Sequence, residues 1–181
     1  MSKNDDLKAV EKTLRGNIRA FETLVAKYQK PIFNGAFRML NQYEDAEDVT
    51  QSVFMKAYEN LNRFDPQYKF FSWLYRILMN ETFNLLNQRR RHSELDADSM
   101  PEIQDRHEYQ GAIELEKDIQ EALMDLKPNY RSVIVLNHFQ NFSYTEMSNI
   151  LEIPEKTVKS RLFTARHILK DILMRKGFVT S

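Results

Sequence analysis

The sequence predicts an all-α protein made of two small helical domains joined by an acidic flexible linker. The 181 residues include only four Gly and five Pro, so turn signals are scarce, whereas helix formers such as Leu, Glu, Lys and Ala are frequent. Apolar residues recur every three or four positions, and runs that alternate apolar and polar residues are absent. A hydrophobic fraction of 42% is enough to build real cores in a chain of this length.

Charge divides the chain into three blocks. Residues 1–92 hold 15 Lys/Arg against 11 Asp/Glu, residues 93–121 hold 2 against 10, and residues 122–181 hold 9 against 5. The formal net charge of zero therefore conceals two mildly basic blocks around an acidic one. This pattern suggests two modules that face nucleic acid and a connection that repels the same ligand. We place the boundaries at 1–92, 93–111 and 112–181.

Several classes of site lack their residues. The chain has no cysteine, which excludes a disulfide framework, a thiolate metal site and a Cys nucleophile. Motifs for phosphate, dinucleotide or nucleophilic-serine chemistry are absent, and metal-ligand spacing is not found among the histidines, His92, His107, His138 and His167. Adjacent acids at 44–48 could hold a cation, but such acids more often form a solvated or partner face. We expect no enzyme activity, no cofactor and no metal.

The N-terminal segment MSKNDDLKAVEK carries charges where a signal peptide needs an apolar core. The sequence also lacks an apolar stretch long enough to span a bilayer. We therefore expect a cytoplasmic protein without membrane insertion.

Helical spacing begins near Phe21 and continues to Leu40, with Pro31 expected to kink or reset the helix. A second helix is predicted from about Glu44 to Leu61. Its outer face places large apolar groups beside carboxylates, namely Glu44, Glu47, Gln51, Phe54, Met55 and Tyr58. Such a face suggests a partner surface, although on the residues alone we favour packing of Phe54 and Tyr58 on a neighbouring helix.

The segment RFDPQYKFFSW follows, in which aromatic side chains crowd around Arg63 and Lys69. A further helix is predicted from about Ser72 to Arg91. One stripe of this helix consists of hydrogen-bond donors, namely Arg76, Asn80, Asn84, Asn87 and Arg91. Asn is a poor helix former, so the stripe suggests either a binding function or a merely solvated face, and both interpretations remain open.

Helical periodicity stops between Ser93 and about Gly111, where acidic residues dominate. It returns from Ala112 to Leu126, and a further helix is predicted from Tyr130 to Phe139. The next segment, NFSYTEMSNILEIPEKTVKSRLFTARHILKDIL, has the layout of a helix-turn-helix. Ser143 and Glu146 form a capping-box pattern, and Ile153-Pro154 supplies the turn.

The second helix of this pair has an outward face that suits a DNA major groove. Its Lys and Arg side chains can reach phosphates or guanine, and Phe163 can touch a thymine methyl group. An ordinary helical hairpin with a charged surface is the alternative. The capping box, the turn and the basic face together favour the DNA interpretation.

The sequence resembles the extracytoplasmic-function (ECF) group of bacterial RNA polymerase sigma factors over nearly the whole chain. EDAEDVTQSVFMKAY resembles the group's polymerase-binding helix, and FFSWLYRILMNETFNLLNQRRR resembles its promoter-melting helix. LKPNYRSVIVLNHFQNFSYTEMSNIL resembles the start of its C-terminal domain, and IPEKTVKSRLFTAR resembles its recognition helix. The order and spacing of these motifs also match, which is more specific than a helix-turn-helix alone.

The resemblance implies an alternative sigma factor with a region 2-like domain, residues 1–92, and a region 4-like domain, residues 112–181. It implies three sets of site residues. Core polymerase would be bound by Glu44, Asp45, Glu47, Asp48, Gln51 and Phe54. The melted −10 element would be held by Arg63, Tyr68, Lys69, Phe70, Trp73, Arg76, Asn80 and Asn84. The −35 duplex would be read by Lys156, Thr157, Lys159, Ser160, Arg161, Phe163, Thr164 and Arg166.

The implied partners are core RNA polymerase, through the coiled coil of its largest subunit and its flap region, promoter DNA, and an anti-sigma factor. The acidic linker, residues 93–111, would thread through the polymerase as an RNA mimic or serve as a simple tether. The alternative function is a stand-alone helix-turn-helix regulator with an N-terminal sensor or interaction domain. The aromatic and Asn-rich segment 63–91 argues against that alternative, because a sensor has no need for a donor stripe beside clustered aromatic rings.

Overall fold

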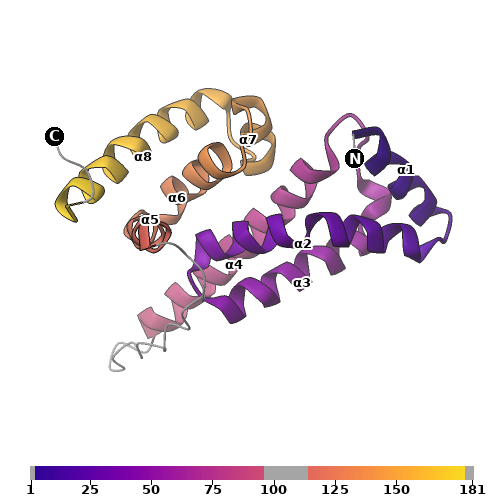
Figure 1. Cartoon of the computed structure of the whole chain (residues 1–181), viewed down its shortest axis with the longest axis horizontal. Coiled ribbons are helices and arrows are strands. Elements are labelled where there is room, and N and C mark those ends of the chain that lie inside the picture. Colours follow the sequence, from indigo (N-terminus) through magenta and orange to yellow (C-terminus); the bar gives the residue numbers. More distant parts are fainter. Residues whose placement is uncertain (1–2, 96–113, 178–181) are drawn as a thin grey trace.

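The computed structural model describes residues 3–95 and 114–177, and within them every regular element is a helix (Figure 1). The all-α prediction is therefore confirmed. The elements are α1 Lys3–Leu14, α2 Ile18–Leu40, α3 Tyr43–Glu59, a 3-10 helix Leu61–Arg63, α4 Phe70–Leu95, α5 Glu114–Met124, α6 Pro128–Ile134, one turn of π-helix (the π-turn) Val135–Phe139, α7 Tyr144–Leu151 and α8 Glu155–Arg175. Among these helices none is long and apolar enough to cross a bilayer. Residues 96–111 of the predicted linker lie outside the described residues.

The N-terminal half packs α2, α3 and α4 side by side, with α1 beside the N-terminal part of α2 (Figure 1). Apolar residues at helical spacing on α2, among them Leu24, Ile32 and Met39, are fully buried. Helix α4 approaches α2 closely at Gly35, where an added Cβ would lie 2.6 Å from the Tyr75 hydroxyl. Tyr75 donates a hydrogen bond of 2.9 Å to the Pro31 carbonyl. This close approach fixes the position of α4 on α2.

The predicted restart at Pro31 is wrong, because α2 continues through it from Ile18 to Leu40. Proline removes one backbone donor, which would pair with the carbonyl of Lys27. Both Lys27 and Pro31 are only partly buried, so water can satisfy that carbonyl. The apolar face of α2 meets α3 and α4 on both sides of the proline, and this packing keeps the helix continuous.

The C-terminal half consists of α5 to α8. The predicted capping box is present, because Ser143 Oγ accepts from the Glu146 amide at 3.2 Å and Glu146 Oε2 accepts from the Ser143 amide at 2.9 Å. The predicted helix from Tyr130 to Phe139 is divided between α6 and the π-turn. Helix α8 buries Val158, Leu162, Ala165 and Ile172 against the rest of this half.

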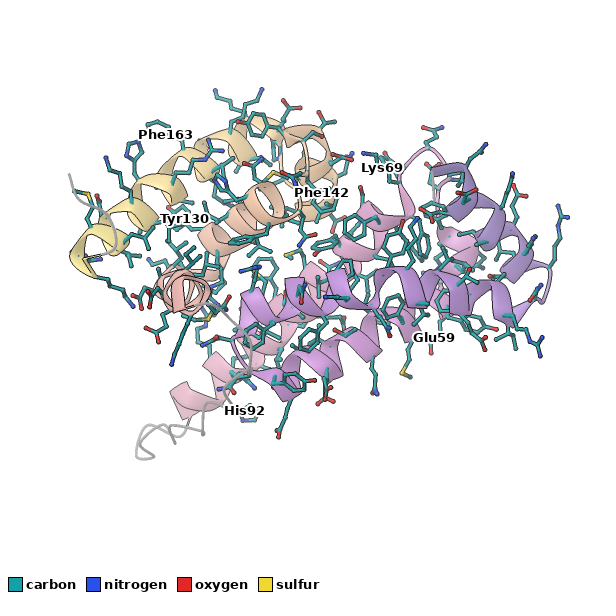
Figure 2. The ribbon with its side chains drawn as sticks, viewed as in Figure 1. Glu59, Lys69, His92, Tyr130, Phe142 and Phe163 are labelled. Carbon is teal, nitrogen blue, oxygen red and sulfur yellow. The ribbon has the colours of Figure 1, made fainter. Side chains whose placement is uncertain are left out.

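The two halves pack against each other and share one continuous hydrophobic core. In Figure 2, Phe142 of the C-terminal half lies toward α4. The described contacts join α4 to α7 and the C-terminal end of α2 to α5 and α6.

Candidate nucleic-acid and partner interfaces

Helix α3 presents an acidic outer face. Glu44, Glu47, Asp48 and Gln51 are exposed, as the sequence predicted. Asp45 is half-buried and accepts a hydrogen bond of 2.6 Å from Arg89 of α4. Among the residues that the structure describes, no helix covers the three exposed acids of this face, so they are available to a cationic partner.

Phe54 does not lie on this outer face, so the packing favoured from the residues alone is confirmed and the position that the family resemblance implies is not. Phe54 is 8% exposed and belongs to the core, whereas Met55 is 63% exposed and Tyr58 is 46% exposed. Position 54 lies at the edge of the helix face that carries Val53 and Ala57, and the ring is drawn into the core by burial of its apolar surface. The exposed apolar side chains beside the acids are therefore Met55 and Tyr58.

Glu81 of α4 holds α3 in place from the other side. Its two oxygens accept from Ser52 at 2.8 Å and from Lys56 at 2.6 Å. Together with the Arg89–Asp45 pair, these contacts fix the rotation of α3, so its outer face is presented rigidly.

Much of the aromatic segment predicted to hold melted DNA is structural. Phe70 is 1% exposed, so its ring is not accessible to DNA in this structure. Its ring packs against Phe64 and Trp73 with centroids 5.4 and 5.6 Å away, because aromatic rings gain both buried area and edge-to-face contacts in such a cluster. Trp73 is half-buried, and Tyr68 is 47% exposed. Tyr68 is the exposed aromatic side chain of this segment, and Phe71 and Trp73 are each partly exposed.

The donor stripe of α4 is exposed along its length, as the spacing predicted. It consists of Arg76, Asn80, Asn84, Asn87 and Arg91. Exposed amide and guanidinium groups in one row can donate to base edges and phosphates of a single strand.

Two cations at one end of this surface are bound by acids at the two ends of α7, one in its first turn and one directly after it. Lys69 Nζ lies 2.8 Å from Glu146 Oε1, and the Arg76 guanidinium binds the Glu152 carboxylate. Burial alone would raise the pKa of Glu146, but hydrogen bonds from Lys69 and Ser143 outweigh it and hold this pKa below its usual value. Sequence reasoning missed both acids as partners, because the pairs span about 80 residues and no local pattern encodes them.

The outward face of α8 is basic, as predicted. Lys156, Lys159, Ser160, Phe163 and Arg166 are exposed, with Phe163 at 65%. The other predicted contacts on this helix are half-buried, namely Thr157, Arg161 and Thr164. The Phe163 ring meets His167 edge-on at 4.4 Å, which orients an apolar surface outward.

Arg166 is held by the π-turn. Its Nη2 donates to Asn137 Oδ1 at 2.9 Å and its Nε donates to His138 Nε2 at 3.1 Å. Burial and the nearby Arg166 charge lower the pKa of His138, which favours the neutral imidazole that accepts this bond. Asn137 and His138 are therefore positioning residues that the sequence did not reveal, because they lie 28 to 29 residues from Arg166.

Within residues 3–95 and 114–177, groups of three or more His, Asp or Glu side chains that could hold a metal ion are not found. The described geometry thus offers two basic surfaces, on α4 and α8, and one acidic surface with apolar side chains, on α3.

Family models match both halves of the chain. The sigma-70 region 2 model matches residues 24–92, and the sigma-70 region 4 model matches residues 116–169. RNA polymerase sigma-H factor from Pseudomonas aeruginosa is 31% identical and covers 96% of both chains. ECF RNA polymerase sigma factor SigW from Bacillus subtilis is 32% identical, covering 92% of this chain and 95% of that protein. The chain belongs to the ECF group of RNA polymerase sigma factors.

Solved structures agree with this membership. The sigma factor RpoE in complex with the anti-sigma factor NepR, from Bartonella quintana, is 26% identical with a TM-score of 0.74, over 85% of this chain and 96% of that one. CnrH in complex with the cytosolic domain of CnrY is 28% identical with a TM-score of 0.70, over 96% of this chain and 97% of that one. The stand-alone regulator is set aside, because the N-terminal half matches sigma-70 region 2. This ECF member is an alternative sigma factor, which directs RNA polymerase to promoters.

Proposed function

We propose that the two halves of this sigma factor read two promoter elements while α3 binds core RNA polymerase. The observation that carries the proposal is the exposed donor stripe on α4, within the region 2 match. A base taken out of its stack needs donors for its edge and an aromatic surface for its face. The stripe with Tyr68 and Trp73 supplies both. The proposed domains are residues 1–92 and 112–181, with residues 93–111 as the linker.

Core polymerase is bound by the outer face of α3. Its contacts are Glu44, Asp45, Glu47, Asp48 and Gln51, to which the exposed Met55 and Tyr58 are added. Interfaces combine apolar anchors with a charged rim, and this face has both. The largest subunit's coiled coil is the partner that the family resemblance assigns to it.

The −10 and −35 elements are held by separate surfaces. The melted −10 strand contacts Arg63, Tyr68, Lys69, Trp73, Arg76, Asn80 and Asn84. The −35 duplex contacts Lys156, Thr157, Lys159, Ser160, Arg161, Phe163, Thr164 and Arg166. Cations on both surfaces neutralise phosphates, and the polar and apolar side chains between them contact bases.

The chain itself performs no catalysis, because polymerisation belongs to the enzyme it recruits. Its partners are core polymerase, including the flap region, promoter DNA and an anti-sigma factor such as the one that the Bartonella relative binds. It acts in the cytoplasm and joins the nucleoid when bound to polymerase.

Replacing Asn80 and Asn84 by alanine tests the −10 assignment. Strand opening on a promoter selected by transcription with core polymerase should fall about tenfold or more, since two base-edge donors are lost. Permanganate reactivity of thymines reports opening, and duplex recruitment should stay near wild type. The control replaces two exposed helical asparagines elsewhere, Asn34 and Asn149. Normal strand opening in the Asn80/Asn84 variant would show that the stripe is only a solvated surface.

Replacing Lys159 and Arg166 by alanine tests the −35 assignment. Each lost phosphate contact should reduce the slope of log K against log salt by about one unit. Fluorescence anisotropy with duplex promoter DNA at several salt concentrations measures this slope. Replacement of Lys12 and Lys30, exposed lysines of the N-terminal half, provides the control. An undiminished slope would show that Lys159 and Arg166 touch no phosphate.

A further inference from the structure

The acids that bind Lys69 and Arg76 lie on one short stretch of the C-terminal half. Glu146 belongs to the first turn of α7, and Glu152 is the C-cap residue that directly follows this helix. Their carboxylates form ion pairs with Lys69 and Arg76, the two cations that are proposed to bind DNA phosphates. Carboxylate and phosphate oxygens make the same charge-assisted bonds to Lys and Arg. The two ligands therefore compete for the same groups.

An aromatic contact anchors the same stretch. Phe142, just before α7, is 4% exposed. Its ring stacks on Phe71 at 5.4 Å and meets the edge of Tyr75 at 5.1 Å. Because both partners belong to α4, the burial of Phe142 depends on the two halves being together.

A second set of contacts closes the other end of the interface. The last carbonyls of a helix have no partner within it. At the C-terminal end of α2, Gln120 donates to the Phe37 carbonyl at 3.1 Å, and Arg131 donates to the Met39 carbonyl. The Arg38 guanidinium lies 3.7 Å from the centre of the Phe139 ring. The C-terminal half thus caps a helix of the N-terminal half.

The C-cap geometry of α7 sets the direction of the Glu152 side chain. The Glu152 backbone is left-handed, with φ 53° and ψ 40°, a conformation that costs less for Gly or Asn than for Glu. Helices commonly end on a residue in this conformation. Here the turn directs a carboxylate to Arg76.

We infer that the free sigma factor closes on itself, and that Glu146, Glu152 and Phe142 form an intramolecular latch over one end of the −10 surface. This inference rests on the −10 assignment of Lys69 and Arg76. In the closed state the outer face of α3 and the basic face of α8 remain exposed. Core polymerase can therefore bind α3 first, after which the latch must open before the −10 strand reaches Lys69 and Arg76.

The strength of the latch depends on salt. All four charged partners are at least a quarter exposed, so dissolved ions screen the pairs. The contact is intramolecular, and a high effective concentration allows such modest pairs to add to the closure that the aromatic contact and the capping of α2 also support. Closure should weaken as salt rises, whereas the aromatic contact of Phe142 should not.

The experiment uses the full chain with dyes on two introduced cysteines, at Asn62 in the N-terminal half and Asn149 on α7. The sequence has no cysteine of its own, so labelling is confined to these positions. The test variant carries Glu146→Gln and Glu152→Gln, which preserve side-chain size and, for Glu146, a capping-box residue. The matched control carries Glu22→Gln and Asp171→Asn, exposed acids that remove equal charge.

Energy transfer between the dyes should fall in the test variant at low salt and stay at the wild-type level in the control. Binding of a fluorescent single-stranded DNA 12-mer of randomised sequence should tighten about tenfold over the control if about 90% of the free chain is closed. A Phe142→Ala variant should lower transfer at all salt concentrations.

The two readouts separate the latch from the −10 assignment. Equal transfer in wild type, test variant and control at every salt concentration would overturn the latch. Suppose instead that energy transfer falls in the test variant but DNA binding does not tighten. The two halves then do close on each other, but closure does not block DNA binding. In that case the assignment of Lys69 and Arg76 to DNA is also wrong.

Discussion

Replacing Asp48 by arginine and Met55 by alanine is expected to weaken binding of core RNA polymerase by roughly 100-fold or more. Met55 is 63% exposed and stands among the acids of α3, which is the arrangement of an apolar anchor with a charged rim. Reversing the charge of Asp48 turns attraction to a basic partner into repulsion. Both side chains are exposed, so the fold should lose little stability.

Titration of the labelled chain with purified core enzyme measures this affinity, and thermal unfolding verifies that the variant is folded. A matched control carries Glu11→Arg and Leu14→Ala, which change an exposed acid and an exposed apolar residue of α1. Wild-type affinity in a folded Asp48/Met55 variant would remove α3 from the polymerase interface.

Local signals predicted much of the fold. The capping box depends on residues three positions apart, Ser143 and Glu146, and the structure has both of its hydrogen bonds. The stripe on α4 follows from the 3.6-residue period, and its five members are exposed. Features set by neighbours within one helical turn are therefore readable from the sequence.

The orientation of large apolar residues at the edge of a helix face was less predictable. Phe54 and Phe70 both turn inward, although the family resemblance implies that each lies on a binding surface. A helical period gives the angle of a side chain but does not give the position of the next helix. For an aromatic ring near a face boundary, burial of its large apolar area decides the outcome.

Contacts between the halves could not be predicted from spacing. Arg131 and Met39 are 92 residues apart, and Lys69 and Glu146 are separated by the linker. From the sequence alone, Arg131 would be expected to be one of several exposed cations of a basic block. Its burial follows from the meeting of two helix C-termini, which only the tertiary structure brings together.

Replacing Arg131 by methionine is expected to destabilise the protein by about 3 kcal/mol. The side chain is buried, and its guanidinium donates to the carbonyls of Leu123 at 2.9 Å, Met124 at 2.9 Å and Leu126 at 3.0 Å, as well as to Met39. One cation thus satisfies carbonyls at the C-terminal ends of α5 and α2, where helix dipoles are negative. Methionine keeps most of the volume but leaves these acceptors without donors.

Burial lowers the pKa of Arg131 to about 10, with the charge of Asp125 acting in the opposite direction. The group therefore remains charged at neutral pH, and its stabilising bonds should be present throughout the neutral range. An Arg131→Lys variant should recover only part of the stability, because one ammonium cannot reproduce a planar fork of five donors. Thermal unfolding followed by circular dichroism should show a loss of roughly 5–10 °C for methionine.

Arg175→Met is the control, because Arg175 is exposed at the end of α8 and its loss should change stability by less than about 0.5 kcal/mol. Three of the four acceptors of Arg131 lie in its own half, so most of the loss should be a loss of stability of the C-terminal half. The Met39 contact adds a smaller part that belongs to closure, which reduced energy transfer between the labelled halves would report. A melting temperature equal to that of the Arg175→Met control would mean that water replaces the guanidinium at all of these carbonyls.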